Sequence, residues 1–514
     1  MIHGPNSPDK PSSDEISKSM IGRDDWMEAG KYSLIITYVL CAIIGVAVIA
    51  HAIALLRECF PCWWNWFQRK SMLSFRITAM RRGIVYYTPP KVGIFQIPQM
   101  GATIIIASFC IGVIAWTFSI RPFYRLTREW GSPPLAVRAG MMGAGLVPFI
   151  VCTALKVNPI SLLTGYSHEK LQIFHQWLGC LFLFLSIVHT LPFIIQPSIE
   201  GGASNLHAYF MSDSIYWSGS AALILIVWIV CAGTGFVRRM SYEFFVVQHI
   251  VTTIGLLVCL LLHFEQILNS HLWVWAGVAL WSFATTVRTF MAIFSSEFVF
   301  AKRTQLEVQQ LQNGAYGALN SNEQRDSQLV KLTMSTPMRW KPGQHVYMRF
   351  PTINPLENHP FTIASLPDEI PNVNSQLEIY MRVFGGITRN LYKRASKSSQ
   401  NATDCCEEKK AETTSKMSCS SGSNLNDNVQ FSTESTKIMA LVDGPYGKST
   451  DPAIFECALF VAGGSGVTFV LPVLNDLLRR MRAGKHVVTK RIHFIWATRS
   501  LSAYMLTRRD QLDV

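Results

Sequence analysis

Four histidines lie inside long apolar stretches of the sequence, in two pairs of identical spacing. His175 and His189 are fourteen residues apart in one stretch, and His249 and His263 are fourteen residues apart in another. In an α-helix, fourteen residues return to within about 40° of the starting direction and rise about 21 Å. Each helix therefore presents two imidazoles on one face, near opposite edges of a membrane.

The two histidine-bearing stretches are separated by one further apolar stretch, so the helices they form should run parallel. We expect His175 to face His249 near the cytosolic side, and His189 to face His263 near the outer side. Two facing imidazoles can ligate a haem iron from both sides, so the spacing predicts two stacked haem b groups. A single intramembrane histidine can instead be hydrogen-bonded to a neighbouring helix, but packing explains two equally spaced pairs poorly. Zinc fits less well, because two imidazoles without Cys or carboxylate do not complete a tetrahedral site.

The composition favours a membrane protein, since 49% of the residues are hydrophobic and only 15% are charged. A helix needs about 20 apolar residues to cross a hydrocarbon core of about 30 Å. Seven stretches meet this length, at residues 33–55, 100–120, 136–156, 169–194, 217–237, 244–264 and 272–294. Many of the residues behind the net charge of +13 lie in short loops beside these stretches. That pattern indicates membrane topology and argues against nucleic-acid binding.

The distribution of basic residues predicts the orientation of the spans. The loop between the first two spans contains a single acid, Glu58, and seven basic residues: Arg57, Arg69, Lys70, Arg76, Arg81, Arg82 and Lys91. The loop at 195–216 contains neither Lys nor Arg. We therefore expect the N-terminus outside and everything after about residue 300 in the cytosol. A second group, Arg121, Arg125 and Arg128, falls on the outer side, either as tolerated charges or as an attraction for anionic metal chelates.

The soluble half begins with patterns of strands and turns. The segment His359–Pro360–Phe361–Thr362 reads as an extended entry into a strand. A second strand ends near Arg382 in a glycine pair, where backbone N–H groups and a cation can hold phosphate. Residues 443–447 read as a tight turn, and residues 395–436 read as a disordered insertion rich in Ser, Lys, Asn, Thr and Glu.

A strand–turn–helix pattern follows. A buried-type strand at 458–462 leads into the glycine-rich turn 463–468, and a helix is expected from about 469 to 481. This order makes a dinucleotide phosphate cradle at a helix N-terminus, although glycine-rich turns also serve plain packing. A second strand at 492–497 ends near Arg499, which would favour a 2′-phosphate and hence NADPH. The alternative for Arg499 is a solvated loop charge.

With these residues in view, the chain resembles the ferric-chelate reductases of fungi, within the wider group that includes the NADPH oxidases. The resemblance runs from about residue 100 to the end. It implies that His359, Pro360, Phe361 and Thr362 line the flavin of FAD, and that Arg382, Gly385, Gly386 and Thr388 hold its phosphates. It implies further that NADPH is held by Gly463, Gly464, Ser465, Gly466, Val467, Thr468 and Arg499.

The expected fold is a multi-pass α-helical haem-binding bundle, followed by a cytosolic FAD-binding antiparallel β-barrel and an incomplete α/β NADPH-binding domain. The expected segments are an extracellular segment (1–32), a first span with a basic loop (33–99), the haem domain (100–296), the FAD-binding domain (297–450) and the NADPH-binding domain (451–514). The resemblance implies further strands and a Cys-Gly motif beyond Val514, so we expect the last domain to be truncated. Gln176 stands where an Arg is more usual.

The function implied is that of a transmembrane metalloreductase without side-chain catalytic residues. Electrons would pass from cytosolic NADPH through FAD and two haems to extracellular Fe(III) chelates, or to Cu(II), in support of iron or copper uptake. The alternatives are a superoxide-generating NADPH oxidase and an inactive or regulatory homologue. We expect the protein in the plasma membrane, with the vacuolar membrane as the alternative, and a functional link to an iron permease or oxidase.

Overall fold

The computed structural model describes residues 28–60, 72–91, 97–124, 132–265, 267–295, 305–311, 329–368, 374–384, 386–394, 436–485 and 487–497. The chain divides into two compact units. One comprises Met1–Leu56 and Trp63–Thr286, and the other comprises Arg57–Cys62 and Val287–Val514. The first unit is helical and the second contains all the described strands.

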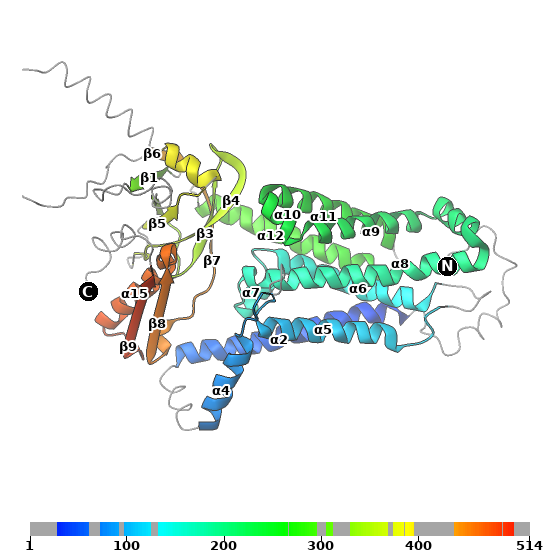
Figure 1. Ribbon diagram of the computed structural model, residues 1–514, viewed down its shortest axis with the longest axis horizontal. Helices are drawn as coiled ribbons and strands as arrows, with labels where there is room; N and C mark the ends of the chain where they lie inside the picture. Colours follow the sequence, from blue (N-terminus) through cyan, green and yellow to red (C-terminus); the bar gives the residue numbers. More distant parts are fainter. Residues whose placement is uncertain are drawn as a thin grey trace, which may run out of the picture. The chain divides into compact units, whose positions relative to one another are not determined.

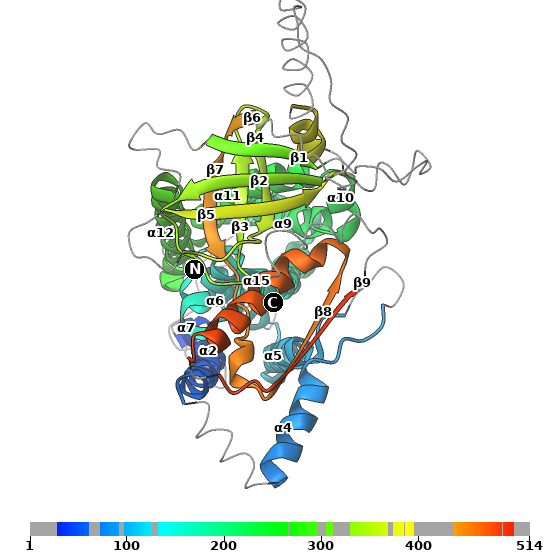
Figure 2. The ribbon, with the colours of Figure 1, turned by 90° about the vertical axis from the view of Figure 1, so that its left-hand side faces the viewer.

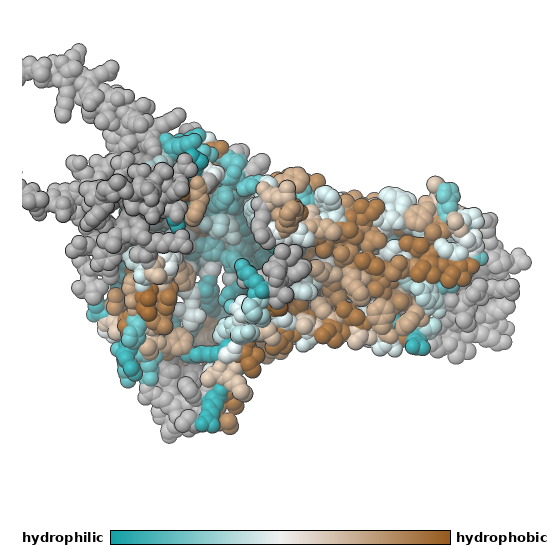
Figure 3. Space-filling view, viewed as in Figure 1, coloured by the Kyte–Doolittle hydropathy of each residue, from teal (hydrophilic) through white to brown (hydrophobic). Residues whose placement is uncertain are grey.

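Long apolar helices build the first unit (Figure 1). Six helices within the described ranges are long and apolar enough to cross a membrane: α2 (Gly30–Cys59), α5 (Met100–Ser119), α6 (Pro134–Ala154), α8 (His168–Ser212), α9 (Ser214–Ala232) and α11 (Tyr242–Phe264). Hydrophobic side chains cover the flank of this unit (Figure 3). An apolar outer surface on a helical bundle is what a lipid environment requires.

The seventh predicted span, 272–294, forms helix α12 (His271–Ser295) but is not among the six. The helix has the expected length, so the prediction of a helix at this place is confirmed.

Helix α8 is longer than the span predicted at 169–194. It continues to Ser212, with non-helical backbone at Gly201 and Gly202, so the segment expected as a loop is largely helical. Pro192 and Pro197 lie inside the helix without ending it. A proline bends a helix but need not terminate it where neighbouring groups satisfy the freed carbonyls. Only at Gly202, where φ is +68°, does the backbone leave helical geometry in a way that favours glycine.

Helix α6 is the most buried of these six spans. Its Arg138 is 1% exposed, and Nη1 donates to the carbonyls of Thr117 at 2.7 Å and Ile120 at 3.0 Å, which end α5. The same guanidinium lies 5.7 Å from the ring centre of Tyr32 in α2. One buried cation therefore joins three helices, because it supplies donors to carbonyls that a helix end leaves without partners.

Two antiparallel sheets form the larger part of the second unit (Figure 2). The first has the strand order β5 (Ser375–Arg382), β2 (Leu329–Thr336), β1 (Gln305–Leu311) and β6 (Thr436–Met439), and the second has the order β4 (Asn354–Thr362), β3 (His345–Phe350) and β7 (Leu441–Tyr446). Alternate residues of β3 and β5 point into one shared core. The predicted turn at 443–447 is mostly strand, since Asp443 to Tyr446 belong to β7 and only Gly447 follows it.

The last segment has the predicted strand–helix–strand order. Strands β8 (Cys457–Gly463) and β9 (Arg491–Ala497) pair in parallel, and α15 (Val467–Arg482) connects them. Alternate residues of β8 are buried, and the amphipathic α15 packs on them. Arg480, near the end of α15, makes a bidentate ion pair with Asp451, which lies before β8. The two nitrogen–oxygen distances are 2.9 and 2.5 Å. Burial raises the pKa of Asp451, but the hydrogen bonds from Arg480 outweigh it and hold that pKa below its usual value.

Candidate redox site in the helical bundle

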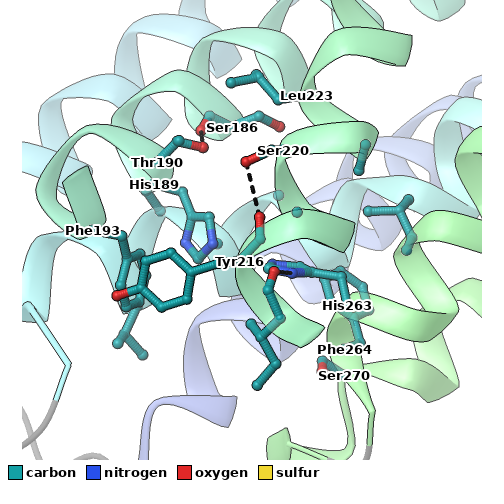
Figure 4. A pocket seen from close by; sticks show the side chains of 18 of the residues that line it. Ser186, His189, Thr190, Phe193, Tyr216, Ser220, Leu223, His263, Phe264 and Ser270 are labelled. Atoms are coloured by element: carbon teal, nitrogen blue, oxygen red, sulfur yellow. Dashed lines mark hydrogen bonds between the residues drawn. The ribbon is translucent and has the colours of Figure 1, made fainter. Parts of the chain in front are cut away.

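The outer pair of histidines faces one cavity. The ring centres of His189 in α8 and His263 in α11 are 5.8 Å apart, and the rings are inclined by 86°. Both imidazoles line a pocket with about 160 Å³ of water-accessible space (Figure 4). Its other walls are mainly apolar, with Phe193 and Tyr216 close to the rings. The spacing of the histidines therefore brings them together at one depth, as predicted.

Each outer imidazole is held by a backbone carbonyl of a neighbouring helix. Nδ1 of His189 lies 2.7 Å from the carbonyl oxygen of Ala136, and Nδ1 of His263 lies 2.9 Å from that of Ile215. A carbonyl only accepts hydrogen bonds, so Nδ1 must carry the proton in both rings. Nε2 then keeps its lone pair, which is the form that ligates a metal.

A glycine makes room for each of these rings. A Cβ atom at Gly140 would lie 2.5 Å from Nδ1 of His189, and one at Gly219 would lie 2.6 Å from Cε1 of His263. Each glycine follows the accepting carbonyl, at residues 136 and 215, by four positions, one turn further along the same helix. The two halves of the outer site thus repeat one arrangement, in which a helix offers a carbonyl and a glycine to one imidazole.

The inner pair is built differently. The ring centres of His175 and His249 are 6.1 Å apart, with an inclination of 71°. Nδ1 of His175 donates to the carbonyl of Ile150 at 2.9 Å. Nδ1 of His249 is buried and has no acceptor within the described ranges, and the ring lies against Phe245. Only one of the two inner imidazoles is therefore fixed by a hydrogen bond.

Both separations suit an iron between two imidazoles. Two metal–nitrogen bonds of about 2.0 Å, plus about 1.1 Å from each nitrogen to its ring centre, give about 6 Å between ring centres. The observed values of 5.8 and 6.1 Å match this distance. Protonation at Nδ1 leaves Nε2 free in three of the four rings. The residues present fit a bis-imidazole haem at each level, and their role as ligands stays a prediction.

The residues predicted to line the flavin lie on an edge strand. His359, Pro360, Phe361 and Thr362 belong to β4, which among the described strands pairs only with β3. Pro360 has no N–H to donate, and an edge strand tolerates this. Nε2 of His359 lies 3.0 Å from a carboxylate oxygen of Glu357, a neighbour that the sequence did not single out.

The predicted FAD-phosphate residues surround the end of β5. Arg382 is the last residue of that strand, and its guanidinium lies over the ring of Phe384. Gly386 has a φ of +57°. Two residues later, the hydroxyl of Thr388 accepts a hydrogen bond from the N–H of Phe384 at 3.1 Å. Residues 386–394 form a helix, so this turn opens onto a helix N-terminus, which favours anions. Gly385 lies outside the described residues.

The glycine-rich turn occupies the predicted place between strand and helix. Gly463 ends β8, a short 3₁₀ turn η5 (Gly464–Gly466) follows, and Val467 begins α15. The Thr468 hydroxyl donates to the carbonyl of Ser465 at 2.9 Å. The indole N–H of Trp496 in β9 donates to the carbonyl of Gly464 at 3.0 Å and so holds the turn. Arg499 lies outside the described residues.

Outside the spans, burial and an ion pair shape one polar cluster on β2 and β5. Lys331 lies 2.8 Å from Glu378, and the Tyr380 hydroxyl lies 3.3 Å from the same carboxylate. Burial, reinforced by the negative charge of Glu378, raises the pKa of Tyr380 to about 12. These residues satisfy one another and do not form part of the predicted cofactor sites.

Several residues that shape the site could not be identified by motif. Gly140 and Gly219 stand out only once the neighbouring helices are known, and the same holds for the carbonyls of Ala136 and Ile215. For Trp496 the sequence indicates only a place in a strand. A signal was present for the glycines, since each lies in an apolar helix, where glycine allows close approach of a neighbour.

Three family descriptions match successive parts of the chain. Residues 139–260 match "Ferric reductase like transmembrane component", residues 318–450 match "FAD-binding domain", and residues 455–510 match "Ferric reductase NAD binding domain". Three of the four paired histidines, His175, His189 and His249, fall within the first match, and His263 follows it by three positions. The predicted order of a membrane domain, a flavin domain and a nucleotide domain is confirmed.

Curated relatives come from several fungi. The chain is 32% identical over 438 residues to "Probable cell surface ferric reductase kap2" of Aspergillus oryzae, covering 82% of this chain and 52% of the relative. It is 27% identical to "Ferric/cupric reductase transmembrane component 7" of Saccharomyces cerevisiae, over 90% of this chain and 67% of the relative. It is 26% identical to "Ferric reductase transmembrane component 1" of Schizosaccharomyces pombe, over 73% and 61%. The chain thus spans between about half and two thirds of the length of these relatives.

Proposed function

Since this multi-pass membrane chain is a homologue of the fungal ferric reductase transmembrane components, with FAD-binding and NAD-binding domains, we propose that it is a transmembrane metalloreductase. Electrons from cytosolic NADPH would pass through FAD and two bis-histidine haems to Fe(III) chelates on the outer side. Cu(II) is a second substrate to test, because the Saccharomyces relative bears the name of a ferric and cupric reductase.

The observation that carries this proposal is the pair of facing imidazoles at each of two depths. Ring separations of 5.8 and 6.1 Å leave room for one metal ion between the rings of each pair. In three rings the hydrogen bond from Nδ1 to a carbonyl leaves Nε2 unprotonated and able to ligate a metal. Two such sites in one bundle are suited to carry single electrons across the bilayer.

The chain's own residues perform the binding, orientation and exclusion of water. When bound, flavin converts the two-electron supply of a nicotinamide into single electrons, and bis-imidazole haem carries these one at a time. The β4 edge around His359 and the turn at Gly386 would hold FAD, and the turn at Gly464 would hold the NADPH phosphates. In the outer pocket, apolar walls such as Leu223 and Phe182 keep water from the imidazoles. His189 and His263 would hold the outer haem, which would supply single electrons to an acceptor on the outer side.

We place the protein in the plasma membrane, consistent with the cell-surface name of the Aspergillus relative, with the vacuolar membrane as the alternative. The basic loop between Arg57 and Lys91 and the soluble domains would face the cytosol. Reduction of iron outside the cell would supply Fe(II) to an iron permease or to an oxidase that precedes one.

The test is expression of the 514 residues in cells that lack surface reductase, with extracellular Fe(III)-chelate reduction as the readout and superoxide dismutase present. The vector alone and the His189→Ala variant are the controls. We expect reduction that depends on His189 and persists with the dismutase.

Two other results would contradict the proposal. Reduction abolished by the dismutase would identify a superoxide-generating oxidase, because superoxide would then be the reductant. Haem-containing protein at the surface with no NADPH-dependent reduction of any acceptor would indicate a regulatory role.

A further inference from the structure

Helix α4 (Met72–Val85) lies in the basic segment between the first two spans and carries an apolar stripe. Leu73, Ile77, Met80 and Ile84 follow one another at intervals of four, three and four residues, which places them within about 60° on one face of a helix. All four are exposed, Leu73 at 69% and Met80 at 67%. An exposed apolar stripe of this length is unusual unless another surface covers it.

Positive charge borders the stripe. Around the helix axis, Arg76 and Arg81 lie on either side of the stripe, at about 60° and 80° from Leu73. Arg82 lies on the opposite face of the helix from Leu73. Arg76 and Arg81 are exposed. The sequence contains no Asp or Glu between Glu58 and Glu129. An apolar face flanked by arginines, with no acid nearby, is complementary to an anionic lipid surface, since the stripe enters the acyl boundary while the guanidinium groups meet phosphates.

The end of α4 is fixed to the start of a membrane span. Val85 packs on Gly101 in the first turn of α5, so closely that a Cβ atom at Gly101 would lie 2.7 Å from Cγ1 of Val85. The N–H of Met100 donates to the carbonyl of Tyr87 at 2.9 Å. Tyr86 and Tyr87 are exposed at this junction, and tyrosine is enriched where a span meets the headgroups. The end of α4 therefore lies beside the start of a candidate membrane span.

We infer that α4 lies on the cytosolic surface of the membrane and binds anionic phospholipid. Leu73, Ile77, Met80 and Ile84 enter the boundary between headgroups and acyl chains, and Arg76 and Arg81 bind lipid phosphates. The site belongs to the same leaflet as the inner histidine pair, because Nδ1 of His51, near the end of α2, lies 2.8 Å from the carbonyl of Leu163, shortly before α8 begins. This inference requires neither haem nor a nucleotide.

The test is hydrogen–deuterium exchange of the full chain in nanodiscs, read on peptides covering residues 72–85. The two lipid compositions are phosphatidylcholine alone and phosphatidylcholine with about 30% phosphatidylserine, which gives the surface a negative potential. We expect exchange in α4 to slow about tenfold in the anionic discs. The double variant Arg76→Gln, Arg81→Gln should lose this difference. The control double variant, Lys485→Gln with Lys490→Gln, removes two positive charges from the second unit. It should keep the difference in α4 exchange between the two lipid compositions.

Two outcomes would overturn the inference. Equally fast exchange in both lipid compositions would mean that α4 projects into water. Equally slow exchange in both, unaffected by the arginine substitutions, would mean that a protein surface covers the stripe, either of this chain or of a second copy. Exchange in the buried helix α6 reports whether the first unit is folded in each variant, and exchange in the core strands β2 and β5 does so for the second unit.

Discussion

The outer and inner histidine pairs have the same spacing in sequence and similar ring separations, but they are held in different ways. Both outer rings donate Nδ1–H to a helix carbonyl and pack against a glycine. Of the inner rings, only His175 has such an acceptor, and Nδ1 of His249 has none within the described ranges. Helix periodicity thus suffices to bring imidazoles together, whereas their orientation depends on what the neighbouring helices offer.

A second difference is the surrounding space. The outer rings line a pocket bounded by α6, α8, α9 and α11, so each ring is supported by a helix other than its own. For the inner pair this support comes from Ile150 of α6 on one side and from Phe245, on the same helix as His249, on the other. The outer site is therefore more fully preorganised for a ligand between the rings.

The largest expected effect is the loss of one haem when a ligand is removed. His189→Ala or His263→Ala should abolish the outer site, and His175→Ala or His249→Ala the inner one. Each should remove about half of the low-spin haem absorbance and all electron transfer across the membrane, because one of the two proposed bis-imidazole sites would be lost. Absorbance spectra and pyridine haemochrome assays measure this.

The control for the ligand substitutions is His51→Ala. His51 belongs to neither pair, and its Nδ1 lies 2.8 Å from the carbonyl of Leu163. Its removal should leave both haems in place. Unchanged haem content in His189→Ala would refute the assignment of the ligands.

The next effect separates the two pairs. Gly140→Ala or Gly219→Ala would place a methyl group 2.5 or 2.6 Å from an outer ring, which must then move away from its carbonyl. We expect haem affinity at the outer site to fall about 10- to 100-fold, as is typical when the group that orients a ligand is lost. The inner site should keep its haem and its spectrum.

Matched glycine substitutions provide the control for that experiment. At Gly112 an added methyl group would meet no neighbouring atom within 4 Å, and at Gly255 the nearest would be Leu225 at 3.6 Å. Gly112→Ala and Gly255→Ala should therefore leave both haems in place. Potentiometric titration resolves the two sites. Equal effects at both sites, or an effect of the control substitutions, would show that helix packing in general is responsible.

A smaller effect concerns the rate of haem release. In His189→Ala only the inner site remains, and in His249→Ala only the outer. Because Nδ1 of His249 has no acceptor among the described residues, we expect the inner haem to transfer to apomyoglobin roughly tenfold faster than the outer one. Equal rates would mean that the missing hydrogen bond of His249 does not weaken ligation.

The sequence is sufficient for the main elements because their signals are local. The fourteen-residue spacing follows from helix geometry alone, and β8, the glycine-rich turn and α15 follow from composition and order. Helix α8 extends beyond its predicted end at residue 194, because the prediction followed the apolar stretch and the segment after it is more polar. A polar, proline-containing segment can also continue a helix when another helix, here α9, follows directly.

The support of the site could not be predicted, because it depends on which helices are neighbours. Nothing in the sequence around Gly140 connects it to His189, 49 positions later. The same is true of Trp496 and Gly464, which meet only because β8 and β9 pair in parallel. Ligand spacing is a property of one helix, whereas the shape of the pocket is a property of several.

The smallest expected effect tests whether hydroxyl groups contribute to the order of the outer site. Ser186 and Ser220 line the pocket, but the Ser186 hydroxyl donates to the carbonyl of Phe182 at 2.8 Å and the Ser220 hydroxyl to that of Tyr216 at 2.9 Å. Each hydroxyl is thus satisfied by its own helix, a common arrangement for serine in membrane helices. Ser186→Ala and Ser220→Ala should change haem affinity by less than about 0.5 kcal/mol, or roughly twofold. Haem titration of the purified variants measures this, and a loss comparable to that of Gly219→Ala would mean that the hydroxyls, and not only the carbonyls and glycines, distinguish the outer pair from the inner one.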